Sequence, residues 1–283
     1  MSSLSFDPSG GGVGAFVNGL DLNEGLSAEI VAAMRDALGQ HGVLFLRNQN
    51  ISPEKHVAFA EQFSTIDINR FFTPVADYPM IAEVRKEPDQ KTNIGGGWHT
   101  DHSYDLDPAM GSILLARETP PKGGDTIFAN MYSAYDTLSD GLKETLSRLR
   151  GVHSSRHVFG VDAPRFQDKN NDAEDRLHNA EAATQDSIHP LVIRHPISGR
   201  KALYVNPGFT IGVEGWAEKE SKALLAMLYE HAKQPEHAYR FQWEPGSIAF
   251  WDNRATWHYA VNDYHGARRL MHRITLGGEA LAA

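Results

Sequence analysis

The stretch WDNRATWHYAVNDYHGARRLMHRITL, residues 251–276, combines a β-type pattern with charged side chains at regular spacing. Successive side chains of a strand point to opposite faces, so this pattern places Arg269, Met271 and Arg273 on the same face. Two arginines on one face of a core strand are costly unless they are paired. A guanidinium binds a carboxylate or sulfonate through two parallel hydrogen bonds, so the pair is compatible with anion binding. Structural ion pairs with Asp or Glu are the other explanation, and this stretch alone favours them.

Short β-type runs dominate the chain from about residue 80 onward. Turn signals such as Pro120–Pro121 and Gly123–Gly124 separate them. With no internal repeat and no linker, the pattern predicts a single domain over residues 1–283, mainly β, with helices packed outside an antiparallel, barrel-like or sandwich core. The runs are MIAEVRK (80–86), GSILLARE (111–118), DTIFANM (125–131), LVIRHP (191–196), KALYVN (201–206), YRFQW (239–243), SIAFWD (247–252) and RRLMHRITLGG (268–278).

Helical periodicity is clearest in the first quarter of the chain. Ser27 and Ser52 are suitable N-caps, Pro53 suits a first helical position, and Gly42 can end the first helix. The predicted elements outside the β-type runs are a lead-in at 10–14, a first strand within 15–22, helices at 26–42 and 51–63, a buried strand at 43–46, and helices at roughly 133–149 and 217–232.

Segment 160–187 is polar and acidic and shows little periodicity. One interpretation is a surface insertion. The other is a mobile lid over a site, because long loops in compact domains are often functional. The sequence leaves both open.

Composition excludes several classes of protein. The chain has 283 residues, a formal net charge of −9 and no Lys/Arg run, so nucleic-acid binding is not expected. There is no cysteine, which excludes disulfides and thiolate metal sites. Neither a signal peptide nor an apolar run of about 18 residues is present, so we expect a cytoplasmic protein with no membrane span.

The stretch WHTDHSYD, residues 98–105, carries a histidine and a carboxylate two positions apart. In a strand, His99 and Asp101 would point the same way and could meet at one ion. They would supply two ligands of the two-histidine, one-carboxylate set that suits Fe(II). His-x-Asp alone is a weak signal, so a metal site, an acid–base pair and a polar strand end all stay possible.

Taken together, these blocks resemble the Fe(II)/2-oxoglutarate-dependent dioxygenases of the taurine dioxygenase and 2,4-dichlorophenoxyacetate dioxygenase family. The resemblance covers nearly the whole chain and includes PPKGGDTIFANMYSAYDTLS, HPLVIRHPISGRKALYVNPGFT and EKESKALLAMLYEH in the family's order. It implies a double-stranded β-helix, or jelly-roll, core with helices packed around it. Fe(II) as cofactor, with 2-oxoglutarate and O2 as cosubstrates, is likewise what the resemblance implies.

The resemblance also implies roles for individual residues. His99, Asp101 and His258 correspond to the iron ligands. Arg269, together with the Thr126 hydroxyl, corresponds to the group that holds the far carboxylate of 2-oxoglutarate. Related halogenases have a small residue where this chain has Asp101, so we expect hydroxylation, with 2-oxoglutarate converted to succinate and CO2.

For the substrate, the resemblance implies a small anion. Arg273 matches the position that binds the anionic head group in taurine dioxygenase. Asn69 stands where that enzyme has a histidine, and His102 where it has valine, which argues against taurine itself. Aryloxyalkanoates, alkyl sulfates and other sulfonates stay possible, and hydroxylation next to the heteroatom would cleave the carbon–heteroatom bond. The predicted substrate-binding residues are Asn69, Phe72, His102, Phe159, Phe209 and Arg273.

Three alternatives accompany this interpretation. The same triad could bind Zn²⁺ in a hydrolase, which would leave Arg269 and Thr126 without a role. The chain could be an anion-binding regulatory barrel with an inactive metal site. It could also be a dioxygenase of this family for a different carboxylate-bearing metabolite. The family commonly forms dimers or tetramers, so a homo-oligomer is expected.

Overall fold

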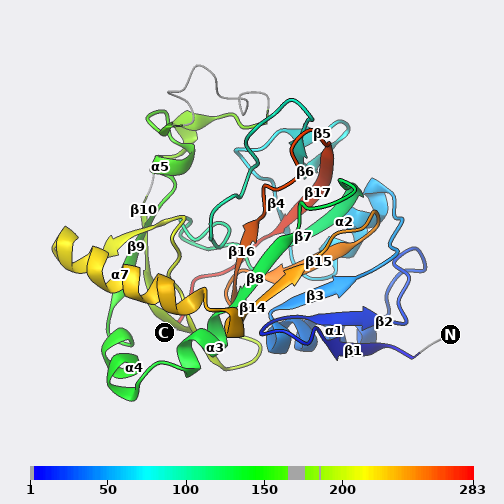
Figure 1. Cartoon of the computed structure of the whole chain (residues 1–283). Helices are drawn as coiled ribbons and strands as arrows, with labels where there is room; N and C mark the ends of the chain where they lie inside the picture. The colour runs from blue at the N-terminus through cyan, green and yellow to red at the C-terminus, as the bar shows by residue number, and fades with distance from the viewer. Residues whose placement is uncertain (1–2, 165–175, 185) are drawn as a thin grey trace.

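A nine-stranded sheet forms the larger β layer of the computed structural model, which describes residues 3–164, 176–184 and 186–283. Its strands are β1 (Ser5–Pro8), β2 (Ala15–Asn18), β3 (Val43–Leu46), β4 (Ile66–Asp67), β5 (Pro74–Val75), β6 (Tyr78–Lys86), β7 (Gly111–Glu118), β15 (Ile248–Asp252) and β17 (Arg269–Leu276). Their order is β1-β2-β3-β15-β7-β17-β6-β5, and β4 also pairs with β17 (Figure 1). Both ends of the chain therefore contribute to one sheet.

A smaller β layer faces this sheet. It contains the antiparallel set β14-β8-β16, and two further small sheets continue beyond it, β10-β9-β13 and β11-β12. The strands are β8 (Thr126–Asn130), β9 (Arg150–Ser154), β10 (Asp186–Pro190), β11 (Val192–Arg194), β12 (Lys201–Leu203), β13 (Thr210–Val213), β14 (Ala238–Phe241) and β16 (Thr256–Ala260). Buried apolar side chains fill the space between the layers, with the rings of Phe45 and Phe241 stacked at 4.3 Å.

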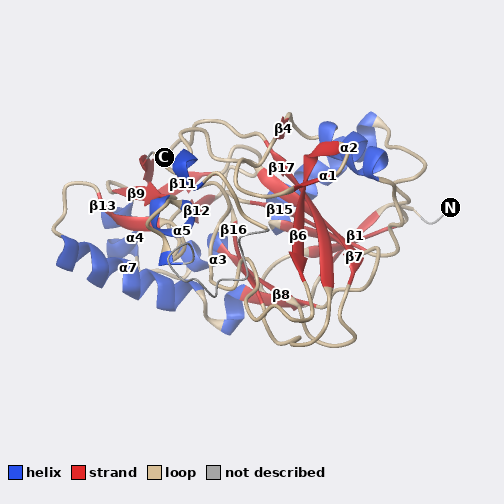
Figure 2. Cartoon of the chain, turned by 90° about the horizontal axis from the view of Figure 1, so that it is seen from above, coloured by secondary structure: helices blue, strands red, loops and turns tan. Residues whose placement is uncertain are grey.

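The helices lie outside the two β layers. Contacts place α1 and α2 against the nine-stranded sheet and α7 against β13, and the two groups lie at opposite ends of the molecule (Figure 2). The α-helices of the described residues are α1 (Ala28–His41), α2 (Pro53–Glu61), α3 (Met131–Asp136), α4 (Asp140–Leu146), α5 (Arg156–Phe159) and α7 (Glu218–Ala232). Two 3-10 turns lie at Ala180–Ala182 and Pro235–His237. This is the predicted arrangement of helices around a β core.

Local signals place the first two helices well. The Ser27 and Ser52 side chains accept hydrogen bonds from the backbone of Ile30 and Lys55, as predicted for N-caps. Gly42 ends α1 with φ +74°, a conformation that glycine adopts without the steric cost of a Cβ.

The prediction of one continuous helix at roughly 133–149 is wrong. The segment 133–149 forms two helices, α3 and α4, because Ser139 is extended and breaks the helical path between them. This break lets Leu138 pack into the apolar cluster beneath α7. Seven strands have no counterpart among the predicted runs, namely β1, β4, β5, β9, β10, β13 and β16.

The predicted insertion or lid at 160–187 lies partly outside the described residues, which lack 165–175 and 185. In its described part, Phe72 and Leu177 form an isolated β-bridge, and Ala180–Ala182 form a 3-10 turn. Whether the segment closes over a site stays a prediction. Within the described residues, no helix is long and apolar enough to span a membrane.

Candidate active site

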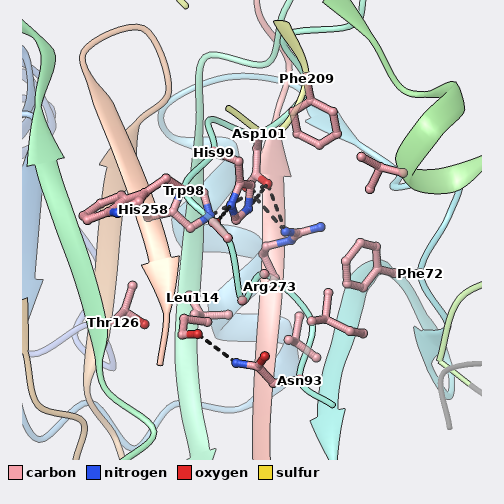
Figure 3. Close-up of a pocket in the computed structure, with 18 of the residues that line it drawn as sticks. Phe72, Asn93, Trp98, His99, Asp101, Leu114, Thr126, Phe209, His258 and Arg273 are labelled. Carbon is pink, nitrogen blue, oxygen red and sulfur yellow. Dashed lines mark hydrogen bonds and ion pairs between the residues drawn. The ribbon is translucent and has the colours of Figure 1, made fainter. Parts of the chain in front are cut away.

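The three predicted metal ligands converge at one point (Figure 3). His99 and His258 face each other in an isolated β-bridge, each backbone N–H donating to the other's carbonyl at 3.1 and 2.8 Å. One nitrogen from each histidine and one Asp101 oxygen lie within 4.8 Å of one another. The strand condition under which the sequence brought His99 and Asp101 together is not met throughout 98–102, because the chain turns at Asp101 and His102 has φ +58°. That turn brings the carboxylate to the two rings.

Hydrogen bonding, burial and charge leave these groups in the states that a divalent metal requires. Nδ1 of His99 lies 2.7 Å from the Gly97 carbonyl, so it carries the proton and Nε2 keeps its lone pair. Burial lowers the pKa of both His99 and His258 and so favours neutral imidazoles. Burial raises the pKa of Asp101, but nearby positive charge, that of Arg273 foremost, outweighs it and holds the pKa below its usual range. Neutral histidines and an ionised carboxylate fit a metal ion.

Arg273 lies beside this triad. Its Nη1 is 3.3 Å from Asp101 Oδ1, and its guanidinium stands 4.3 Å from the Phe72 ring centroid. Figure 3 shows it between Asp101 and Phe72. The Ser112 hydroxyl donates to the other Asp101 oxygen at 3.0 Å. The structural ion pair left open by the sequence is thus present at Arg273.

Arg269 is held differently. It is 4% exposed, and its Nε and Nη2 have no hydrogen-bond partner among the described residues. The nearby Asp125 carboxylate is already bound by Arg240 at 2.6 Å. Burial lowers the pKa of Arg269. A buried guanidinium with unused donors is costly, and an anion in the cavity would relieve that cost.

A cavity of about 660 Å³ joins all of these groups. It is lined by the three predicted ligands, by Thr126 on β8 and by both arginines of β17. It is also lined by the other predicted substrate residues, Asn69, Phe72, His102, Phe159 and Phe209. Every residue predicted for the site therefore faces one space. Asp101 is the only carboxylate among the described residues of its wall.

A family model described as "Taurine catabolism dioxygenase TauD, TfdA family" matches residues 5–275. The chain belongs to this family. An alkylsulfatase of Acinetobacter baylyi is 36% identical over 273 residues, covering 95% of this chain and 83% of the relative. An alpha-ketoglutarate-dependent sulfate ester dioxygenase of Pseudomonas putida is 32% identical over 278 residues, covering 98% and 90%.

A solved taurine dioxygenase from Burkholderia xenovorans superposes with a TM-score of 0.81 at 35% identity, covering 99% of this chain and 93% of that one. The predicted family, jelly-roll fold and enzyme class are confirmed: the protein is an oxidoreductase of the 2-oxoglutarate-dependent dioxygenase class. Family membership carries 2-oxoglutarate and O2 as cosubstrates. It does not favour the zinc hydrolase or the inactive barrel.

Both ring nitrogens of His102 are engaged. Nδ1 lies 2.9 Å from Asp105 Oδ2 and Nε2 lies 3.0 Å from the Asn69 amide nitrogen. The Asn69 oxygen accepts from the backbone of Phe71 at 3.0 Å, which fixes the amide orientation. His102 therefore lines the cavity and also holds Asn69 in place.

Two contributors were missed by the sequence analysis. Asp105 holds His102 and also pairs with Arg70 at 2.7 Å. Trp243 donates its indole N–H to the Thr126 hydroxyl oxygen at 3.0 Å. No sequence signal marks either residue. Trp243 acts on Thr126, which is 117 residues away in the chain, and Asp105 reaches His102 only through the turn that the chain makes between them.

Proposed function

We propose that this dioxygenase hydroxylates a small organic anion, an alkyl sulfate, sulfonate or aryloxyalkanoate, with an apolar body. The observation that carries the proposal is the pair of buried, unused donors on Arg269 in the cavity that also contains His99, Asp101 and His258. These three residues would hold Fe(II), whose fit rests on the neutral rings and the ionised carboxylate. Bound iron supplies the activation of O2, with 2-oxoglutarate oxidised to succinate and CO2 and one oxygen atom reaching the substrate.

The protein's own contribution is binding and orientation. Arg269 and the Thr126 hydroxyl would hold the far carboxylate of 2-oxoglutarate through charge-assisted hydrogen bonds. Arg273 and the Asn69 amide would hold the anionic group of the substrate. These contacts would hold both anions beside the metal site, and such positioning is a major part of what an enzyme supplies.

The wall of the cavity supports an apolar substrate body. Phe72, Phe159 and Phe209 line it, together with Val84, Ile94 and Val158. An ammonium group such as that of taurine would find only Asp101 as a counter-charge among the described wall residues, and Asp101 faces the two histidines and Arg273. Anions without an amine are therefore favoured. Curated relatives named as an alkylsulfatase and a sulfate ester dioxygenase agree with this substrate class.

If hydroxylation falls on the carbon that bears the heteroatom, the product collapses. An alkyl sulfate would give an aldehyde and sulfate, a sulfonate would give an aldehyde and sulfite, and an aryloxyalkanoate would give a keto acid and a phenol. This carbon–heteroatom cleavage is part of the proposal.

The test starts with anaerobic protein, Fe(II) and 2-oxoglutarate, in which a visible charge-transfer band is expected. Oxygen is then admitted and succinate is measured over alkyl sulfates, sulfonates and aryloxyalkanoates, with taurine and propanesulfonate as a matched pair. We expect no band from His99→Ala, a normal band from the control His265→Ala, whose side chain is exposed, and more succinate with propanesulfonate than with taurine. A folded wild-type protein with no band and no succinate would refute the assignment.

The remaining expectations are proposals of the same kind. One domain over residues 1–283 is supported by the pairing of strands from both chain ends in one sheet. Assembly into a dimer or tetramer follows from the family resemblance, and a cytoplasmic location stays an expectation. Light scattering coupled to gel filtration measures the assembly directly, and a monomer at micromolar concentration would contradict it.

A further inference from the structure

A hydrogen bond from a tryptophan decides whether the Thr126 hydroxyl can donate into the cavity. Its oxygen accepts a hydrogen bond of 3.0 Å from the indole nitrogen of Trp243. An indole N–H can only donate, so the threonine oxygen must be the acceptor. The hydroxyl proton of Thr126 is then left to point elsewhere, and it has no acceptor among the described residues. The hydroxyl therefore enters the cavity as a donor.

The indole of Trp243 is itself held in a fixed orientation. It is 7% exposed and packs edge-on against Phe241, with ring centroids 4.8 Å apart and planes at 83°. Phe241 pairs with Thr126 across strands β14 and β8. The same strand pairing that places the threonine therefore places the tryptophan that directs its hydroxyl.

Trp243 also contacts the other anion-binding group. The Arg269 guanidinium carbon stands 5.7 Å from its ring centroid, within the range of a cation–π contact. Gly124, at φ +71°, leaves room beside this arginine, since a Cβ there would stand 3.3 Å from Arg269 Cδ. One indole thus supports two groups whose hydrogen-bond donors are still unused.

We infer that Trp243 is a positioning residue for 2-oxoglutarate: its N–H turns the Thr126 hydroxyl into a donor for the far carboxylate, and its ring supports Arg269. The inference rests on the proposed function. It concerns a residue that would touch neither the metal nor the substrate. Loss of Trp243 should therefore weaken the binding of 2-oxoglutarate and leave metal binding intact.

The test is calorimetric titration of the Mn(II)-loaded protein with N-oxalylglycine, a non-reacting analogue of 2-oxoglutarate. Trp243→Phe removes the N–H and keeps a ring, and we expect the dissociation constant to rise about 3- to 10-fold. Thr126→Val should raise it similarly, and adding Trp243→Phe to Thr126→Val should change it less than 2-fold further. Trp243→Leu should weaken binding more than Trp243→Phe, because it also removes the ring beneath Arg269.

Controls separate this role from a structural one. Trp216→Phe, at a tryptophan that is 39% exposed, should bind as wild type does, and Mn(II) affinity should be equal in all variants. Wild-type affinity in Trp243→Phe, or equal losses from Trp243→Phe with and without Thr126→Val, would overturn the inference. Equal losses from the Phe and Leu variants would overturn the part that concerns Arg269. A folded wild-type protein that does not bind N-oxalylglycine at all would instead overturn the proposed function.

Discussion

The two arginines of β17 that line the cavity are held in opposite ways. The part of the cavity around Arg269 is its first end, and the part around Arg273 is its second end. Arg269 leaves Nε and Nη2 unused, while Trp243 supports its guanidinium and the neighbouring Asp125 is bound by Arg240. Arg273, four residues further along β17, already pairs with Asp101 and lies over Phe72. The first end has donors with no partner among the described residues, and an added anion can satisfy them. The second end shares its charge with the triad and so places looser demands on the anion, which suits a family with varied substrates.

Removing Arg269 should produce the largest difference between the two ends. We expect Arg269→Ala to weaken N-oxalylglycine binding to the Mn(II)-loaded protein by about 100-fold, because a buried charge-assisted contact is lost. Arg268→Ala is the matched control, since this neighbour precedes β17, does not line the cavity, and pairs with Glu87 and Glu118. Calorimetry gives both constants. A loss of less than 3-fold in Arg269→Ala would mean that the cosubstrate binds elsewhere.

Removing Arg273 should affect the other end. We expect Arg273→Ala to raise KM for the anionic substrate by about 10-fold or more, while the affinity for N-oxalylglycine changes less than 3-fold. Arg273→Lys should recover only part, because an ammonium lacks the planar fork. Steady-state succinate formation and calorimetry measure the two effects. Equal damage to both ligands would show that the ends are not independent.

A change at Gly208 tests whether His99 belongs to the proposed metal site. A Cβ there would lie 2.7 Å from the Cβ of His99, so Gly208→Ala should displace the histidine. We expect about a tenfold loss of Mn(II) affinity, comparable with the loss of an outer hydrogen bond to a metal ligand. Gly141→Ala is the control, since a Cβ there meets nothing within 4 Å. Unchanged metal binding in Gly208→Ala would remove His99 from the proposed ligand set.

The smallest expected effect concerns Asn69. Asn69→Ala removes one neutral hydrogen bond and should raise the substrate KM about 3-fold. Asn69→Asp should raise it further, because it adds a negative charge beside an anionic substrate. The ratio of the two KM values is the informative quantity. A lower KM in the Asp variant would indicate a cationic substrate, and the second end would then not be an anion site.

Much of the fold could be predicted because its signals are local. Caps at Ser27 and Ser52 and the apolar runs of β3, β7 and β15 depend only on neighbouring residues. Strands β9, β10 and β13 were missed because they carry glycine, proline and charged side chains and are stabilised by pairing with one another. The break between α3 and α4 serves the burial of Leu138, which a local pattern does not reveal.

The candidate site was predictable in its residue types but not in its internal bonds. The spacing of Arg269 and Arg273 on β17 placed both in the cavity, as period 2 requires. Sequence could not tell that one is paired with Asp101 and the other is unused. The role of Trp243 depends on a contact with Thr126, 117 residues away, for which a single sequence carries no signal. The role of Asp105 depends on the turn that brings it back to His102.

The bridge between His99 and His258 has a consequence for the order of folding. More than half of the chain separates these two residues, so their pairing closes a long loop and should form after the local hairpins. A metal bound across that bridge would stabilise only chains that have completed this closure. Its contribution would grow with free metal concentration, and the midpoint of thermal unfolding would rise accordingly. Metal supply would then govern the lifetime of the enzyme in addition to its activity.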